Sequence, residues 1–139
     1  MSVLTPEARE LLESDALIHL VTLNPDGSPQ VSGVWAGLDG DEIVSGHMDV
    51  RKKLENVKRD PRIALSVEAP TKNRIGLKEY LVVHGKGRVE VGGAAQLLQR
   101  LAHTYLGPDE VFPPGEHSAD DGYILRITPE RLGGVGPWA

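Results

Sequence analysis

The stretch EIVSGHMDVRKKLENVKRDP, residues 42–61, organises the interpretation of the whole chain. It opens with the apolar pair Ile43-Val44 of a predicted strand and turns through residues 45–49. It then continues as a predicted helix that ends at Asp60, because the following proline disfavours helical geometry in the residue before it. With Asp49 as the expected cap, three cations fall in the first helical turn: Arg51, Lys52 and Lys53.

These three cations oppose the helix dipole, whose N-terminal end is already positive. One interpretation is an anion site, where unpaired backbone N–H groups and basic side chains converge on one phosphate. The other is a solvated basic face whose aliphatic stems lie along the surface. Composition leaves both interpretations open.

The length and the amino-acid composition of the chain indicate one soluble domain spanning residues 1–139. The net charge is −5, so general nucleic-acid binding is not expected. The absence of cysteine excludes disulfides and thiolate catalysis, and it is compatible with a cytoplasmic location. The polar N-terminus is not a signal peptide, and no apolar run reaches the roughly 20 residues of a membrane span, so no membrane partner is expected.

Hydrophobic patterning predicts a mainly β, α+β protein. Besides the helix described above, helices are expected from Pro6 to about Ser14 and over 94–105. Six strands are predicted at 16–23, 29–36, 42–47, 62–69, 79–91 and 122–127, the first three as an antiparallel meander. Gly85 and Gly87 predict a bulge or bend in the fifth strand. A loop over 107–121 and a flexible tail from Gly133 complete a small six-stranded antiparallel barrel with peripheral helices.

No self-contained catalytic motif is present. The chain has no G-x-S-x-G and no Walker motif, and Glu90 replaces the last glycine of a dinucleotide fingerprint. The histidines lack metal-ligand spacing, so no metal site is expected, and only His47 lies beside the candidate anion site. A phosphorylated cofactor whose ring lies along residues 32–35 and 43–46 would supply redox chemistry itself. The absence of a self-contained catalytic motif also fits a protein that catalyses no reaction.

The order of these segments resembles a known family. Residues 24–32 (NPDGSPQVS), Trp35, residues 39–43 (DGDEI) and residues 51–66 (RKKLENVKRDPRIALS) carry the resemblance, which continues through 85–91 and 127–131. Together they resemble the flavin/deazaflavin oxidoreductases of the pyridoxamine 5'-phosphate oxidase-like split-barrel superfamily. The branch that uses coenzyme F420, a deazaflavin, instead of FMN is the most similar.

The resemblance implies an FMN-binding split-barrel fold and a homodimer with two cofactor sites at the subunit interface. Many relatives carry proline where this chain has Gly33, which leaves more room beside the ring. The implied cofactor-binding residues are Arg51, Lys52, Lys53 and Asn56 for the phosphate, Ser32, Gly33, Val34, Trp35, Val44, Ser45, Gly46, His47 and Met48 for the ring, and Trp138 as a contribution across the interface. No side chain is implied to be catalytic.

The implied activity is hydride transfer from reduced F420 to a conjugated small molecule of the biliverdin, quinone or unsaturated-lactone type. The propionates of biliverdin would suit the basic connection with Lys72, Arg74 and Lys78. Two alternatives stay open. One is an FMN-dependent oxidase or reductase of the pyridoxamine-phosphate-oxidase type. The other is a non-catalytic cofactor or tetrapyrrole-binding protein.

Overall fold

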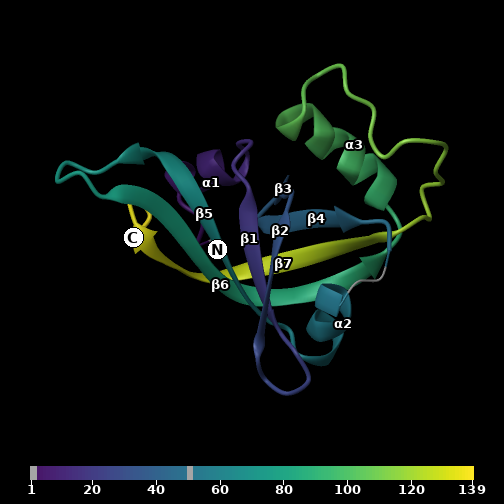
Figure 1. Cartoon of the computed structure of the whole chain (residues 1–139), viewed down its shortest axis with the longest axis horizontal. Coiled ribbons are helices and arrows are strands. Elements are labelled where there is room, and N and C mark those ends of the chain that lie inside the picture. The colour runs from purple at the N-terminus through teal and green to yellow at the C-terminus, as the bar shows by residue number, and fades with distance from the viewer. Residues whose placement is uncertain (1–2, 50–51) are drawn as a thin grey trace.

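A computed structural model describes residues 3–49 and 52–139. Within these residues one antiparallel sheet has the strand order β2-β1-β5-β6-β7-β4-β3 (Figure 1). The elements along the chain are α1 Pro6–Leu12, β1 Ile18–Leu23, β2 Pro29–Val34, β3 Gly37–Asp39, β4 Glu42–His47, α2 Lys52–Arg59, β5 Arg62–Lys72, β6 Lys78–Val91, α3 Ala94–Tyr105 and β7 Tyr123–Val135.

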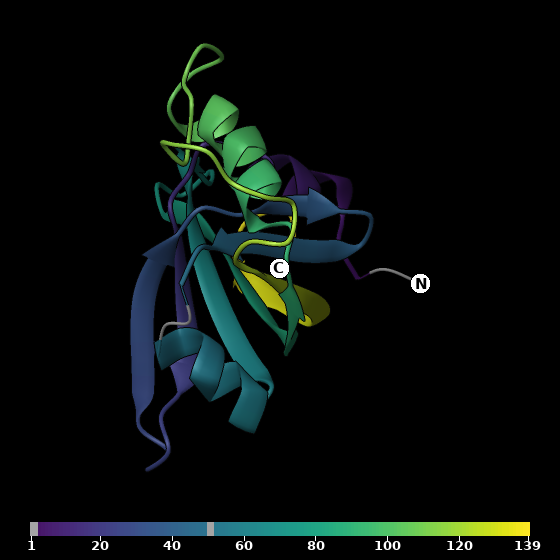
Figure 2. The same cartoon turned by 90° about the vertical axis from the view of Figure 1, so that its right-hand side faces the viewer.

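The sheet has two hydrophobic layers. The larger core lies inside the curve of the sheet and includes Leu20, Leu65 and Leu125, with Leu12 of α1 packed against it. A second layer lies between α3 and the outer face of β4 and β7, where Val44, Leu98, Leu101 and Ile124 are buried. Figure 2 shows α3 and α2 at separate ends of the molecule. No helix in the described part of the chain is both long and apolar enough to cross a membrane.

The long strands β6 and β7 form the spine of the sheet, and the bulge predicted near Gly85 is confirmed. His84 pairs with Arg131 and Gly85 with Pro129, so Glu130 is an extra residue on β7. A Cβ at Gly85 would lie 2.3 Å from the carbonyl oxygen of Thr128. Only glycine allows the two backbones to approach so closely at this irregularity.

The predicted three-strand meander is wrong. The β1–β2 hairpin forms as expected, but β4 pairs with β7 and β3 and not with β2. The reason is an additional strand that was not predicted, β3 at Gly37–Asp39. It follows β2 and turns back onto β4 through residues 40–41. Because β2 and β3 end the strand order, the sheet is open and not the closed six-stranded barrel.

The flexible tail predicted from Gly133 is also wrong, because β7 pairs with β6 as far as Tyr80↔Val135. The glycines fit a crowded strand: a Cβ at Gly134 would lie 2.2 Å from the Tyr80 carbonyl oxygen. Beyond the strand, Trp138 is 8% exposed, and its Nε1 donates a 2.9 Å hydrogen bond to that same carbonyl. The C-terminal segment is therefore fixed to the sheet.

Candidate functional site

Two stretches predicted to contact a cofactor ring lie on free strand edges. β2 is at the end of the sheet, so one side of its backbone has no strand partner among the described residues. β3 pairs with residues 42–44 of β4 only, so among the described residues Ser45 and Gly46 have a strand partner on the β7 side alone. Free edges present N–H and C=O groups that can bind the polar rim of a planar heterocycle.

The chain connection brings these two edges toward each other although the strands do not pair. Gly37 is opposite Val44, and only residues 35 and 36 separate Gly37 from the end of β2. Both edges also contact α3. The Trp35 ring stacks on Tyr105 at a centroid distance of 5.4 Å, and Gly46 lies directly beneath Leu98.

Ser32 is the predicted ring contact with an unmet hydrogen-bonding need. Its Oγ is buried and has no hydrogen-bond partner among the described residues. Its pair partner across β1 is Leu20, so the hydroxyl is on the inward, apolar face of the hairpin. A buried hydroxyl without a partner is unfavourable by about 1–3 kcal/mol. A polar ligand atom at this point would recover that energy, so the residues present fit a polar heterocycle.

The β4 edge contributes a coupled polar pair. Ser45 is buried, and its Oγ lies 2.8 Å from Nε2 of the half-buried His47 two residues on. Both side chains point to the same face of β4, because alternate residues share a face. By contrast, Val34 and Val44 are buried in the hydrophobic layers, so only their backbone groups are available to a ligand.

The basic end of the predicted site is the start of α2. Lys52 is exposed and Lys53 is half-buried, whereas Arg51 lies outside the described residues. Hydrogen bonds from Ser28 hold the pKa of Asp26, in the β1–β2 turn, below its usual value, and the charge of Lys52 adds a smaller contribution. Lys52 is therefore near that turn. Half-buried Met48 leads from β4 toward this end.

Asn56 is engaged by the fold itself. Its Nδ2 donates to Thr22 Oγ1 and to Asn24 Oδ1, both at 3.1 Å, and its Oδ1 accepts a hydrogen bond from Arg59 at 3.1 Å. The side chain is 1% exposed. This network fastens α2 to β1, so a cofactor role for Asn56 would run through the position of the helix.

Trp138 lies apart from the other predicted residues within the chain. It lines a groove formed by α1, the start of β1 and the base of the β5–β6 hairpin. The start of β1 is at the opposite end of that strand from Thr22, where α2 is attached. Within the chain, the start of α2 therefore lies near the β1–β2 turn and β2 is joined to β4 through residues 35–36 and β3, whereas Trp138 lies at the other end of β1.

Sequence patterns did not indicate the aromatic cluster that supports Trp35. Tyr105 stacks on one side of the indole, and Phe112 from the 107–122 loop packs against it at 5.1 Å. Gln99 holds this loop, because its Nε2 donates to the Glu110 carbonyl at 2.8 Å and its Oε1 accepts from the Phe112 N–H at 3.1 Å. The contacts to Trp35 join segments that are far apart in the sequence, so no local motif indicates them.

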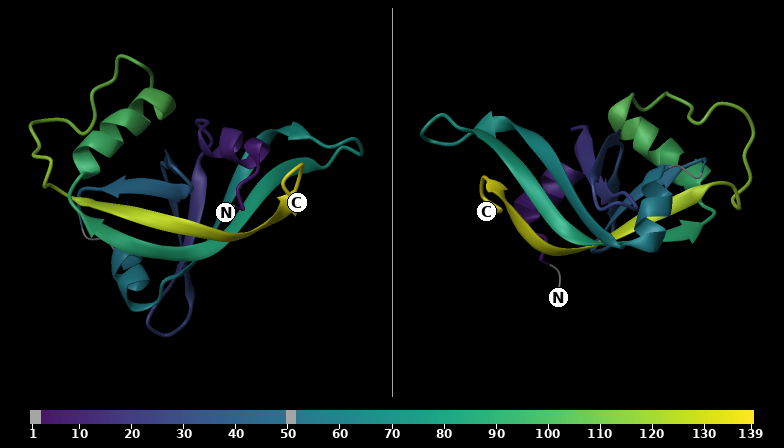
Figure 3. Two further views of the ribbon diagram at one scale, coloured as in Figure 1. Left: turned by 180° about the vertical axis from the view of Figure 1, so that it is seen from behind. Right: turned by 60° about the horizontal axis from the view of Figure 1, so that its bottom comes forward.

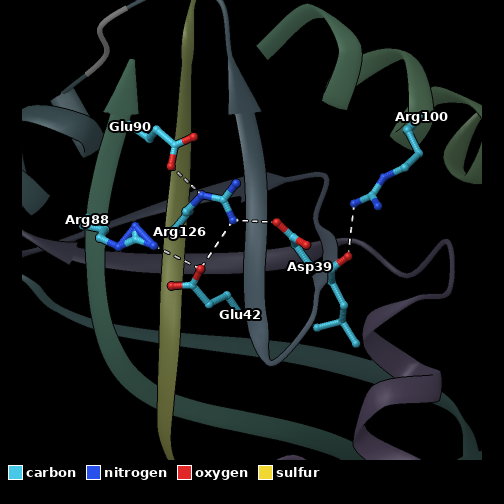
Figure 4. Close-up of polar contacts among 7 residues, drawn as sticks. Asp39, Glu42, Arg88, Glu90, Arg100 and Arg126 are labelled. Atoms are coloured by element: carbon cyan, nitrogen blue, oxygen red, sulfur yellow. Dashed lines mark hydrogen bonds and ion pairs between the residues drawn. The ribbon is translucent and has the colours of Figure 1, made fainter. Parts of the chain in front are cut away.

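An ion-pair network fastens β4 to its neighbours (Figure 4). Arg126 of β7 contacts Asp39 and Glu90, each at 2.8 Å, and Glu42 at 3.4 Å. Arg88 adds a second contact to Glu42 at 3.1 Å. Contact with Asp39 and Glu90 raises the pKa of Arg126, and the same contact lowers the pKa of Asp39. The network connects β3, β4, β6 and β7.

Comparisons with known proteins identify the fold. Residues 4–136 match the family model described as pyridoxamine 5'-phosphate oxidase. An F420 reductase is 30% identical, with a TM-score of 0.73 over 90% of this chain and 94% of the reductase. No curated protein matches the chain.

Two mycobacterial structures share the fold at lower identity. A conserved hypothetical protein from Mycobacterium tuberculosis is 20% identical, with a TM-score of 0.75 over 94% of this chain and 84% of that protein. A heme binding protein from Mycobacterium smegmatis is 23% identical, with a TM-score of 0.66 over 94% of this chain and 52% of that protein. Together with the family model, the strand order and the open curved sheet, these findings lead to one conclusion: the chain belongs to the pyridoxamine 5'-phosphate oxidase-like split-barrel family.

Proposed function

We propose that this protein is an oxidoreductase that uses coenzyme F420 and reduces a conjugated small molecule. The observation that carries the proposal is the buried Ser32 hydroxyl of the edge strand β2, which has no hydrogen-bond partner among the described residues. Family membership supports a flavin-type cofactor in general. The 30% identity to an F420 reductase over nearly the whole chain supports the deazaflavin in particular.

The residues divide into two binding groups. Arg51, Lys52 and Lys53 would hold the phosphate through charge-assisted hydrogen bonds. The backbone of residues 32–35 and 44–48, with the Ser32 and Ser45 hydroxyls and the His47 imidazole, would bind the ring. When bound, the reduced coenzyme supplies a hydride.

The protein contributes orientation. Tyr105 and Phe112 fix the Trp35 indole by ring packing, and the buried Asn56 fixes α2 against β1 by hydrogen bonds. A planar conjugated substrate, such as a quinone, an unsaturated lactone or biliverdin, would stack beside the ring. We further propose that a single 1–139 domain forms a homodimer, with the partner subunit covering the site.

Titration of the purified apoprotein with F420 and, separately, with FMN tests the cofactor. We expect micromolar binding of F420 and weaker binding of FMN. Micromolar FMN binding without F420 binding would contradict the proposed coenzyme and favour an FMN-dependent enzyme. Tight F420 binding with no turnover of any conjugated acceptor would favour a cofactor carrier.

Substitution at the start of α2 tests the phosphate assignment. Arg51→Ala and Lys53→Ala should each weaken F420 binding by about 1.5–3 kcal/mol, because each removes one charge-assisted hydrogen bond. Lys58→Ala is the matched control, since this exposed lysine in the last turn of the same helix pairs with Glu55 at 3.8 Å. Equal affinity in all three variants would contradict the assignment.

A further inference from the structure

A groove lies between α1, the start of β1, the base of the β5–β6 hairpin and the C-terminal segment. Figure 3 shows these segments side by side, with the purple helix α1 next to the yellow C-terminal end. The groove has a volume of about 840 Å³, which is within the range of small-molecule sites. Apart from Trp138, its lining residues are not among the cofactor contacts proposed above.

The floor of the groove is apolar and fixed in position. It includes the buried side chains of Leu11, Ala69 and Trp138, together with Leu17, which is 51% exposed. The indole of Trp138 is held by its hydrogen bond to the Tyr80 carbonyl. These side chains offer preformed apolar surface to the body of a small ligand.

The rim of the groove is acidic. Its carboxylates are those of Glu7, Glu10, Asp15, Glu68 and Glu79, and the only lysine or arginine among its described residues is Lys78. Lys78 lies 3.7 Å from Glu68, whereas Glu7, Glu10 and Asp15 form no ion pair with another described residue. Because a cleft lined by charges of one sign concentrates the electric field, this groove attracts cations and repels anions.

One end of the groove reaches a residue that is proposed to contact the cofactor ring. His19 lines the groove and is paired with Gly33 across the β1–β2 hairpin. Leu17 lines it as well, and its Cδ2 lies 3.3 Å from the position that a Cβ on Gly33 would take. A molecule held at this end of the groove therefore lies next to the part of β2 on which the ring is proposed to bind.

We propose that the groove binds the acceptor that this protein reduces, and that this acceptor is a planar molecule with an apolar body and a positive charge. The reduction rests on the proposed function, whereas the charge preference is a property of the groove alone. For a quinone that carries an ammonium arm, the reaction is balanced: the quinone gains a hydride from the reduced coenzyme and a proton from water, and becomes the hydroquinone.

The charge of the groove separates the acceptors named above. The two propionates of biliverdin would meet the acidic rim, and like charges brought together in a cleft oppose binding. Lys72 and Arg74, which were expected to suit those propionates, do not line the groove. A cationic quinone meets opposite charge at the rim and apolar surface at the floor.

Equilibrium dialysis of the coenzyme-free protein tests the charge preference. The probes are two naphthoquinones that differ only at the end of a short side arm, which is trimethylammonium in one and sulfonate in the other. At low salt we expect the ammonium quinone to bind about tenfold more tightly, since several exposed carboxylates each contribute modestly. Raising the salt concentration from about 0.01 M to about 1 M should reduce the difference.

Substitutions at the rim and the floor place the preference in the groove. Glu7→Gln with Glu10→Gln keeps side-chain size and removes two charges, so the preference should fall to about threefold or less. Leu17→Lys adds a cation at the end near Gly33 and should weaken binding of the ammonium quinone. Glu13→Gln is the matched control, because this exposed residue at the end of α1 does not line the groove.

Turnover by the protein loaded with reduced F420 connects the groove to the reduction. The ammonium quinone should have a lower KM than the sulfonate quinone, and Glu7→Gln with Glu10→Gln should raise that KM more than it changes kcat. An unchanged KM in this variant would overturn the assignment of the groove to the acceptor.

The dialysis result separates this proposal from the proposed function. Equal affinity for the two quinones, or a preference that the Glu7→Gln with Glu10→Gln variant retains, would overturn the proposal even if F420 binds. Binding of neither quinone would also overturn it, and is the result expected if a partner subunit fills the groove. Selective binding of the ammonium quinone by a protein that binds no F420 would instead contradict the proposed function and support the cation preference of the groove.

Discussion

At the scale of the residue, Tyr105 is the side chain that joins α3 to the segment before β1 and to the segment after β2. Its hydroxyl donates to the Ala16 carbonyl at 3.0 Å and accepts from the Ala36 N–H at 3.2 Å. Its ring supports Trp35. Burial is the main cause that raises the pKa of this phenol.

Tyr105→Phe keeps the ring and removes the hydroxyl. We expect a loss of about 1–3 kcal/mol in the free energy of unfolding, because two partly buried backbone groups lose a partner. The natural protein should also lose stability as the pH rises above about 10, since the unfolded phenol ionises before the folded one. The variant should lack this alkaline contribution.

Urea denaturation across a pH range of about 8–11 measures both effects. Tyr80→Phe is the control, because the Tyr80 side chain is 41% exposed and only its carbonyl is bonded to Trp138. If the alkaline loss is the same in Tyr105→Phe as in the natural protein, the buried phenol is not its source.

Asn56 separates a positioning role from a direct ligand role. Asn56→Ala should reduce the free energy of unfolding by about 1–3 kcal/mol, because Thr22, Asn24 and Arg59 each lose a hydrogen-bond partner. It should weaken cofactor binding less than Lys53→Ala does. Denaturation and F420 titration of the same variants provide the two readouts. Unchanged stability with lost affinity would instead indicate a direct contact with the cofactor.

At the scale of the element, the β6–β7 pair depends on close backbone approach at the bulge. Gly85→Ala should be strongly destabilising, by about 1–3 kcal/mol or more, because the new methyl group would overlap the Thr128 backbone. Gly40→Ala is a contrasting control: that turn has φ +61, but a methyl group added there would meet no atom within 4 Å, so only backbone strain applies. Thermal unfolding of both variants measures the difference, and equal melting temperatures would contradict the steric argument.

Sequence patterns predicted the elements better than their pairing. The alternation of β2, the helix 94–105 and the bulge at Gly85 follow from local propensity and glycine chemistry, and all are present. The meander failed because a three-residue strand, Gly37–Asp39, has too short a pattern to recognise. β7 was predicted to end at Ile127, yet it continues past Pro129, because the bulge opposite Gly85 accommodates a residue without an N–H group.

Some residues of the candidate site could be predicted from the sequence, and others could not. The cations at the start of α2 stand out by their charge, and resemblance indicated the β2 and β4 stretches. The Ser45–His47 contact, the aromatic cluster at Trp35 and the Asn56 network were not predicted, because they depend on which elements meet in space. Sequence alone also could not place Trp138, whose position depends on how far β7 follows β6.

At the scale of the whole molecule, an open sheet must hold its edges in place without closing the barrel. At one edge, Arg126 joins the short β3 and β4 to the long β6 and β7 through three carboxylates (Figure 4). Its side chain is 16% exposed, so these contacts are partly shielded from solvent. The same β4 carries the predicted ring contacts Ser45 and Gly46 beyond the end of its pairing with β3, which links the network to the candidate site.

Arg126→Met therefore tests whether this edge is held electrostatically. The substitution keeps much of the aliphatic stem and leaves Asp39, Glu42 and Glu90 clustered without a shared cation. We expect the free energy of unfolding to fall by about 1–3 kcal/mol, a value between those for exposed and buried ion pairs. We also expect amide hydrogens to exchange faster in β3 and β4 than in β6. Affinity for F420 should fall with it, because residues 45–47 lose their fixed position. Arg88→Met is the matched control, since Arg88 is 58% exposed and contacts Glu42 alone among the described carboxylates. The contradicting outcome is that the amide hydrogens of β3 and β4 exchange no faster in the Arg126→Met variant than in the Arg88→Met variant. Hydrogen bonding and the packing of Val44 against α3 would then be sufficient to hold the edge, and the network would have no role in positioning the site.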